Sequence, residues 1–145
     1  MEAMEGILKT LANDLFARHS GLELVSVAPG RATVRMRLQP FHLNGLGGVH
    51  GGAIFTLADF AFAAAANSHG PLAVAINVNI TFSKAISTGE LVAEAREVAL
   101  NPKLGTYTVD VRDAQGELIA VFQGLAYRKT GPTTRPAAGK PPEGA

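Results

Sequence analysis

Hydrophobic positions near the beginning of the chain recur with the spacing of an amphipathic helix. Ile7, Leu8, Leu11 and Leu15 lie one, three and four residues apart, with mostly polar residues between them. In an α-helix, residues at these spacings share one face. The pattern therefore predicts a helix over residues 4–19 that packs through one apolar stripe.

Most of the remaining chain alternates between apolar and polar residues, which is the pattern of half-buried strands. Two such segments, residues 22–27 and 31–39, are separated by Pro29 and Gly30 and predict a hairpin. The longest unbroken alternation covers residues 74–82. Three further strands are expected over residues 90–99, 104–112 and 117–128.

The segment from residue 53 to residue 66 is apolar on almost every side, which is typical of a helix buried in a core. It is rich in alanine, whose small side chain lets strands curl closely around a helix. One long helix among some six antiparallel strands indicates an α+β fold, in which a curved sheet wraps a central helix. Such a sheet has exposed edges, so we expect a dimer that extends it.

Length and composition predict one domain over residues 1–129. Residues 130–145 contain four prolines, three glycines and no large apolar side chain, which predicts a disordered tail. The 145-residue chain has no cysteine, a formal net charge of +1 and no run of like charges. These features exclude disulfides and thiolate chemistry and argue against a nucleic-acid partner.

The first ten residues, MEAMEGILKT, are acidic where a signal peptide is basic, and no long apolar region follows them. The longest apolar stretch is too short to span a membrane and contains Thr56 and Asp59. We therefore expect a cytoplasmic protein without a membrane partner.

An acidic residue, Asp59, stands in the middle of the apolar helix. An ionised carboxylate in apolar surroundings costs several kcal/mol unless it is hydrogen-bonded or paired, or unless its pKa rises. Two interpretations of Asp59 follow. It is a structural acid that is paired with a polar group or partly exposed to solvent, or it is a carboxylate that faces a cleft. A perturbed carboxylate in a cleft is a candidate general base or nucleophile. The residues alone leave both interpretations open.

Glycines crowd the start of the same helix, in the sequence His50-Gly51-Gly52. The free N–H groups of a helix start are candidates to stabilise an oxyanion, although glycines there also simply permit a flexible turn. Gly51 and Asp59 are eight residues apart, which corresponds to about 12 Å along the helix axis. If both act on one carbonyl group, they must come from two subunits of a dimer.

Other residues before the helix complete the candidate chemistry. His50 and Asn44 are expected to orient the loop or to contact a ligand. The histidines have no spacing that suggests a metal site, and no serine stands in a G-x-S-x-G motif. The sequence therefore predicts neither a bound metal nor a Ser-His-Asp triad.

The run HLNGLGGVHGGAIFTLADFAFAAAANSHG, with the later runs NVNITFSKAISTGELVAEAREV and GELIAVFQGLAYR, resembles the hotdog-fold acyl-CoA thioesterases of the phenylacetate-degradation type. The resemblance covers about residues 20–129 and rests mainly on H-G-G followed by L-A-D. It implies a hotdog fold and hydrolysis of a thioester to a free acid and coenzyme A. It also implies a homodimer with two sites, commonly assembled as a homotetramer. Coenzyme A would be part of the substrate, and no separate cofactor is implied.

The resemblance also implies roles for individual residues. Asp59 matches the general base or nucleophile, and the N–H of Gly51 matches the group that polarises the thioester carbonyl. Residues matching Asn44 and His50 position the thioester and the loop. The candidate substrate-binding residues are Gly52, Asn77, Asn79 and Lys84, with Arg96 and Arg128 as further candidates for the coenzyme phosphates.

The strand after the long helix departs from the family pattern. Some relatives place a serine or threonine there to hold the water, whereas this chain has Ala75, Asn77 and Asn79. The two asparagines point to the same face, and the alternative is that they are solvent-facing strand residues.

The acyl group that we expect is aryl or of medium chain length. Two other functions stay open from the sequence. One is a non-catalytic acyl-CoA-binding module, which a costly buried carboxylate argues against. The other is a hotdog-fold hydratase or dehydratase, which the fold alone does not separate from a thioesterase.

Overall fold

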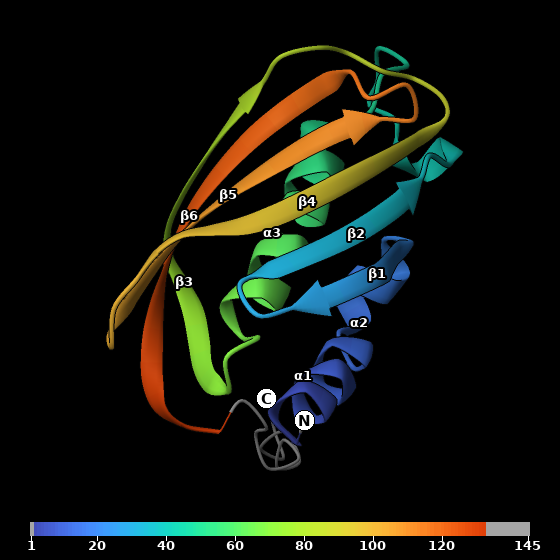
Figure 1. Ribbon diagram of the computed structural model, residues 1–145. Coiled ribbons are helices and arrows are strands. Elements are labelled where there is room, and N and C mark those ends of the chain that lie inside the picture. The colour runs from blue at the N-terminus through green and yellow to red at the C-terminus, as the bar shows by residue number, and fades with distance from the viewer. Residues whose placement is uncertain (1, 133–145) are drawn as a thin grey trace, which may run out of the picture.

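The computed structural model describes residues 2–132, which form one antiparallel sheet and the helices that pack against it (Figure 1). The strands are ordered β1-β2-β4-β5-β6-β3 across the sheet. The alternation of apolar and polar residues predicted all of these strands. Their bounds are β1 Leu22–Ala28, β2 Arg31–Arg37, β3 Pro71–Phe82, β4 Glu90–Leu100, β5 Leu104–Asp113 and β6 Leu118–Pro132.

The longest helix, α3 (Gly51–Ala66), lies in the hollow of the curved sheet and contacts every strand of it (Figure 1). Ala61, Ala64 and Ala65 are completely buried, so the strands approach the helix closely on these sides. The predicted α+β architecture, a central helix wrapped by a curved antiparallel sheet, is confirmed. Within residues 2–132, neither α3 nor another helix is long and apolar enough to cross a membrane.

Aromatic rings fill the space between α3 and the sheet. Phe62 of α3 is 1% exposed, and its ring centroid lies 5.5 Å from that of Tyr107 on β5 and 5.6 Å from that of Phe122 on β6. The Phe62 ring also covers Gly124 of β6, where an added Cβ atom would lie 2.8 Å from ring carbons. Glycine at this position therefore allows the helix to sit close to the sheet.

Three consecutive polar residues tie the end of α3 to different parts of the sheet. Asn67 exchanges hydrogen bonds of 2.9 and 3.1 Å with the backbone at the start of β3. The hydroxyl oxygen of Ser68 accepts a 2.8 Å hydrogen bond from the N–H of Gly30, in the β1–β2 turn. The ring of His69 lies 2.8 Å from the carboxylate of Glu97 on β4. These contacts fix the position of α3 relative to the strands.

The N-terminal helix is interrupted, so the prediction of one helix over residues 4–19 is wrong in this detail. Helix α1 (Glu2–Ala12) ends before helix α2 (Leu15–His19) begins. The side chain of Asp14 caps α2 by accepting a 2.9 Å hydrogen bond from the N–H of Ala17. Aspartate favours such a cap over a helix interior because its carboxylate competes for backbone N–H groups.

Strand β3 forms one edge of the sheet and is more exposed than its alternation predicts. Ile76 and Phe82 are 55% and 51% exposed, although the pattern assigns both to the buried face. Among the strands of residues 2–132 it pairs only with β6, and its register shifts between Ala75 and Asn77. An edge strand that carries exposed apolar side chains is a surface that a second chain would cover.

Strand β6 continues beyond the predicted domain boundary at residue 129. It pairs with β3 as far as Pro132, opposite Pro71. The first residues of the predicted tail are therefore part of the sheet, because β3 provides them with a backbone partner. The rest of the predicted disordered tail, residues 133–145, lies outside the described residues.

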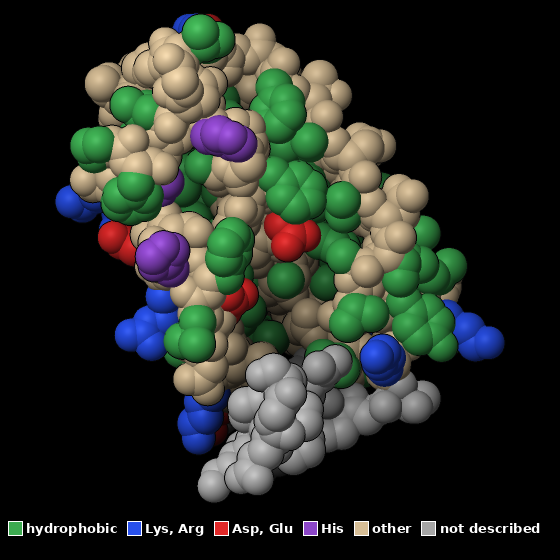
Figure 2. All heavy atoms as spheres, turned by 180° about the vertical axis from the view of Figure 1, so that it is seen from behind, with side chains coloured by type: hydrophobic (Ala, Val, Ile, Leu, Met, Phe, Trp, Pro, Cys, Tyr) green, Lys and Arg blue, Asp and Glu red, His purple; other side chains and the backbone are tan. Residues whose placement is uncertain are grey.

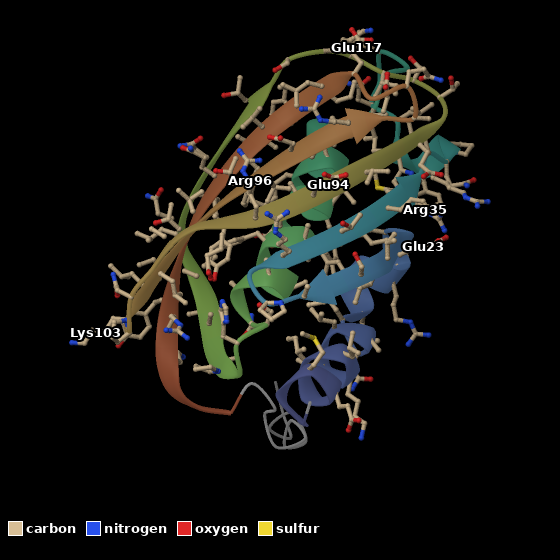
Figure 3. The ribbon with its side chains drawn as sticks, viewed as in Figure 1. Glu23, Arg35, Glu94, Arg96, Lys103 and Glu117 are labelled. Carbon is tan, nitrogen blue, oxygen red and sulfur yellow. The ribbon has the colours of Figure 1, made fainter. Side chains whose placement is uncertain are left out.

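The outward face of the sheet, opposite α3, carries ion pairs (Figure 3). Arg35 of β2 pairs with Glu23 of β1, and Arg96 of β4 lies 3.3 Å from Asp110 of β5. Solvent screens such exposed pairs, so they contribute little to stability. The candidate catalytic residues Asp59 and Gly51 belong to α3, on the opposite side of the sheet.

Candidate active site

A cleft of about 900 Å³ opens beside α3, between this helix and the segments that contain α2 and the 3₁₀ helix η1 (Pro40–His42). On this face of the molecule, acidic side chains lie among hydrophobic ones, with histidines nearby (Figure 2). Aromatic and small side chains make up most of the lining. The lining residues are Asp14, Phe16, Ala17, His19, Ser20, Phe41, His42, His50, Gly52, Ala53, Phe55, Thr56, Asp59, Phe60 and Ala63.

Asp59 lies in the middle of α3, and its side chain lines the cleft. Burial in these apolar surroundings raises the pKa of the Asp59 carboxyl, and the negative charge of Asp14 raises it further. Within the described part of the chain, no donor forms a hydrogen bond to this carboxylate. The structure therefore favours a carboxylate that faces a cleft over an acid that is paired in the core.

His50 caps the start of α3 with its side chain. Its Nδ1 accepts a 2.8 Å hydrogen bond from the N–H of Gly52, and its backbone N–H donates to the carbonyl of His42 at 2.7 Å. A Cβ atom on Gly52 would lie 2.9 Å from Nδ1, so a glycine suits this cap. These contacts agree with the predicted role of His50 in orienting the loop. Gly52 is a predicted substrate-binding residue, but its N–H already donates to Nδ1 of His50.

His50→Ala is expected to lower the free energy of unfolding by about 1 kcal/mol, because the Gly52 N–H loses its acceptor. His50→Asn is the matched variant, since an asparagine side-chain oxygen caps a helix in the same way, and it should restore most of the loss. Urea denaturation of both variants and the wild type measures the differences. Equal stability of the alanine and asparagine variants would contradict the importance of this cap.

Gly51 is the first residue of α3, and among residues 2–132 its N–H has no hydrogen-bond acceptor. An unpaired N–H at the positive end of a helix dipole is suited to a carbonyl oxygen that gains negative charge. Gly51 lines a second cavity, of about 370 Å³. The residues around this cavity are Val49, Gly51, Ile54, Phe82, Ser83, Lys84, Ala85 and Ile86.

Gly51 and Asp59 line different cavities, although they belong to the same helix. Their separation of eight residues corresponds to about 12 Å along the axis of α3. A single chain therefore does not bring both groups to one substrate carbonyl. This geometry agrees with the expectation that a site using both groups takes them from two chains.

Asn44 organises the loop that precedes α3. Its Oδ1 accepts hydrogen bonds from the N–H groups of Leu46, at 2.9 Å, and Gly48, at 3.2 Å. Its own N–H donates to the carbonyl of Gly48 at 2.7 Å. Neither of the two cavities has Asn44 in its lining. These contacts shape the loop, and the predicted role of Asn44 at the thioester stays a prediction.

The predicted substrate-binding residues on β3 and after it do not gather at the Asp59 cleft. Asn77 and Asn79 are exposed on β3, as the solvent-facing alternative expects. Lys84 lines the smaller cavity and forms an ion pair with Glu117. Of these three side chains, only Lys84 belongs to the lining of the two cavities described above.

Arg96 and Arg128, the further candidates for the coenzyme phosphates, lie outside both cavities. Arg96 is engaged with Asp110 on the outward face of the sheet. The Nη1 of Arg128 donates a 3.0 Å hydrogen bond to the carbonyl of Asn101. Their contacts within one chain are therefore structural.

The structure brings three further titratable residues, Asp14, His19 and His42, into the cleft lining. A signal for Asp14 is present in the sequence, because aspartate favours helix N-caps and here stands inside the periodic pattern of a predicted helix. His42 is 3% exposed, with Nδ1 accepting from the N–H of Gln39 at 2.9 Å and Nε2 donating to the carbonyl of Ser20 at 2.6 Å. It thereby joins η1 to the end of α2. Nowhere in residues 2–132 do three or more histidine, aspartate or glutamate side chains gather as a possible metal site.

A long helix enclosed by a six-stranded, curved antiparallel sheet is the arrangement of hotdog-fold thioesterases. The family model described as Thioesterase superfamily matches residues 46–120, which include all of α3. The chain belongs to this superfamily.

Individual relatives agree with this assignment. The chain is 35% identical over 123 residues to the acyl-coenzyme A thioesterase PaaI of Escherichia coli K12, covering 84% of this chain and 88% of that protein. It is 33% identical over 103 residues to human acyl-coenzyme A thioesterase 13, covering 68% and 74%. The solved structure of the PaaI protein from the E. coli phenylacetic acid degradation operon superposes with a TM-score of 0.85 at 33% identity, covering 90% of this chain and 95% of that one. The protein is therefore a thioester hydrolase with a hotdog fold.

Proposed function

We propose that the protein hydrolyses acyl-CoA thioesters whose acyl group is aryl or of medium chain length. Relatives named acyl-coenzyme A thioesterases support the substrate class. The size of the cleft and its lining by Phe16, Phe41, Phe55 and Phe60 support an apolar acyl group, because aromatic side chains bury such groups well.

The observation that carries the proposal is the unpaired carboxylate of Asp59 in this cleft. As a general base, Asp59 takes a proton from water while the water oxygen attacks the thioester carbonyl carbon. The C–S bond then breaks, the coenzyme A thiolate leaves and is protonated, and the free acid remains. As a nucleophile, Asp59 instead forms an anhydride that water opens. Single turnover in ¹⁸O-labelled water tests the anhydride route, because label enters the enzyme carboxylate only when water opens an anhydride at the aspartyl carbonyl.

The proposed site uses two chains. Asp59 of one chain acts on a carbonyl whose oxygen is held by the Gly51 N–H of the other, in accord with the separate cavities that these residues line. Pairing through the exposed edge of β3 would bring two such chains together. A homodimer is thus the smallest active unit that we propose, within a homotetramer.

The two alternative functions fit the site less well. A binding module gains nothing from an unpaired carboxylate whose charged form is disfavoured by burial. In the described chain, the rings of His42 and His50 form hydrogen bonds to backbone groups. A hydratase instead needs a histidine that acts together with an acidic residue.

Thiol release from phenylacetyl-, benzoyl-, hexanoyl- and palmitoyl-CoA tests the activity and the acyl preference. We expect release from the first three and little from the fourth. Binding of these substrates without release would favour the binding module.

Mixing two inactive variants tests the shared site. Asp59→Asn removes the base, and Gly51→Pro removes the N–H at a helix position where proline is well tolerated. In a mixed dimer one site keeps both groups, so random mixing should restore about a quarter of the wild-type activity. A mixture that stays inactive although mixed dimers form would contradict the two-chain site.

A further inference from the structure

Asp14 enters the cleft because the N-terminal helix is interrupted. The break between α1 and α2 turns this side chain toward the N–H of Ala17, and Asp14 then lines the same cleft as Asp59. In an unbroken helix over residues 4–19, Asp14 would lie in the helix interior and would not cap the start of α2. The interruption therefore gives the cleft a second carboxylate.

No lysine or arginine belongs to the lining of this cleft within the described chain. The titratable groups that face Asp59 are Asp14 and His19 from the α2 segment, His42 from η1 and His50 from the start of α3. The rings of His42 and His50 accept hydrogen bonds through Nδ1, at 2.9 and 2.8 Å. Nδ1 of each ring is therefore occupied by a backbone N–H donor.

The two carboxylates therefore share a cleft whose lining contains no lysine or arginine among the described residues. Like charges in such a cleft make each other's ionised form less favourable, and the effect is larger there than in water. Burial is the larger cause of the raised pKa of Asp59, and Asp14 is the second. The 2.9 Å hydrogen bond from the N–H of Ala17 holds the Asp14 carboxylate at the start of α2, beside the cleft that Asp59 also lines.

We propose that Asp14 is a positioning residue of the active site, whose negative charge strengthens Asp59 as the proton acceptor for the attacking water. This inference rests on the proposed function for its catalytic consequence. The interaction between the two carboxylates is independent of turnover and is measured separately.

Asp14→Asn is the decisive variant, because asparagine caps a helix as well as aspartate does but carries no charge. We expect the acid limb of the kcat/KM profile for phenylacetyl-CoA to move to lower pH. Asp59 then ionises more easily and becomes a weaker base, so the rate on the plateau should fall, with KM nearly unchanged. Asp113→Asn is the matched control, since Asp113 also accepts backbone hydrogen bonds in a turn but lies outside the cleft.

Titration of the ¹³C-labelled aspartate carboxyls by NMR provides the readout that does not depend on activity, with Asp59→Asn used to assign the Asp59 signal. A lower pKa of Asp59 in Asp14→Asn, and an unchanged one in Asp113→Asn, is the expected result. An unchanged Asp59 titration in Asp14→Asn would overturn the inference even in an active enzyme. Absence of thiol release by the wild type would instead contradict the proposed function. If Asp14→Asn does not fold, Asp14→Ser, which also caps a helix, takes its place.

Discussion

Asp59→Asn is expected to lower kcat for acyl-CoA hydrolysis by about 10²- to 10⁴-fold, the range that a general base typically contributes. Asparagine has nearly the same shape as aspartate but neither accepts a proton from water nor forms an anhydride. Because the Asp59 carboxylate has no donor bonded to it within the described chain, the substitution breaks no hydrogen bond. Thiol release under saturating substrate measures the loss, and circular dichroism verifies the fold.

Asp110→Asn is a suitable control for the loss of one negative charge. Asp110 lies on the outward face of the sheet, where it pairs with Arg96. We expect the activity of this variant to stay within about twofold of the wild type, because exposed pairs are screened by solvent. Similar activities of Asp59→Asn and Asp110→Asn would remove Asp59 from the chemistry.

Asp59→Asn also has a consequence for stability, and this consequence depends on pH. The pKa of Asp59 is raised in the folded protein, so between its unfolded and folded pKa values the folded state binds more protons. Stability from this group therefore falls as the pH rises through the folded pKa. Asp59→Asn should accordingly be at least as stable as the wild type at neutral pH, with the advantage disappearing in acid. A variant less stable than the wild type at neutral pH would contradict the unpaired state of the carboxylate.

Phe62→Ala is expected to lower the free energy of unfolding by about 3–5 kcal/mol, the cost that is typical when a buried phenylalanine is truncated. Phe62 is 1% exposed and lies between Tyr107 and Phe122, directly above Gly124. Removing the ring leaves a cavity at the contact between α3 and the sheet. Urea denaturation monitored by tyrosine fluorescence measures the change.

Phe16→Ala is the matched control, since the same truncation is made at a side chain that is 67% exposed. It should change stability by less than about 1 kcal/mol, because little apolar surface is returned to water. A Phe62→Ala loss as small as that of the control would mean that the core collapses into the cavity. The position of α3 would then not depend on this ring.

Much of the fold follows from patterns that lie within short stretches of sequence. The period-two alternation predicts the strands because a pleated strand sends successive side chains to opposite faces. The apolar character of residues 53–66 predicts a buried helix for the same local reason. Asp59 could be singled out because it carries the one charge in this apolar segment, and no residue nearby in the sequence compensates for the free-energy cost of burying it. The break at Asp14 was missed because the apolar spacing of the flanking residues continues across it.

The sequence by itself determined the six strands, the long central helix and the α+β class, and it singled out Asp59 and Gly51 as candidate site residues. Only the tertiary structure decided that Asp59 shares its cleft with Asp14, that Gly51 lines another cavity, and that Asn44 and His50 are held by backbone groups. The physical reason is that periodicity is a property of neighbours along the chain. A cleft is built instead from segments that meet only when the sheet curls around its helix.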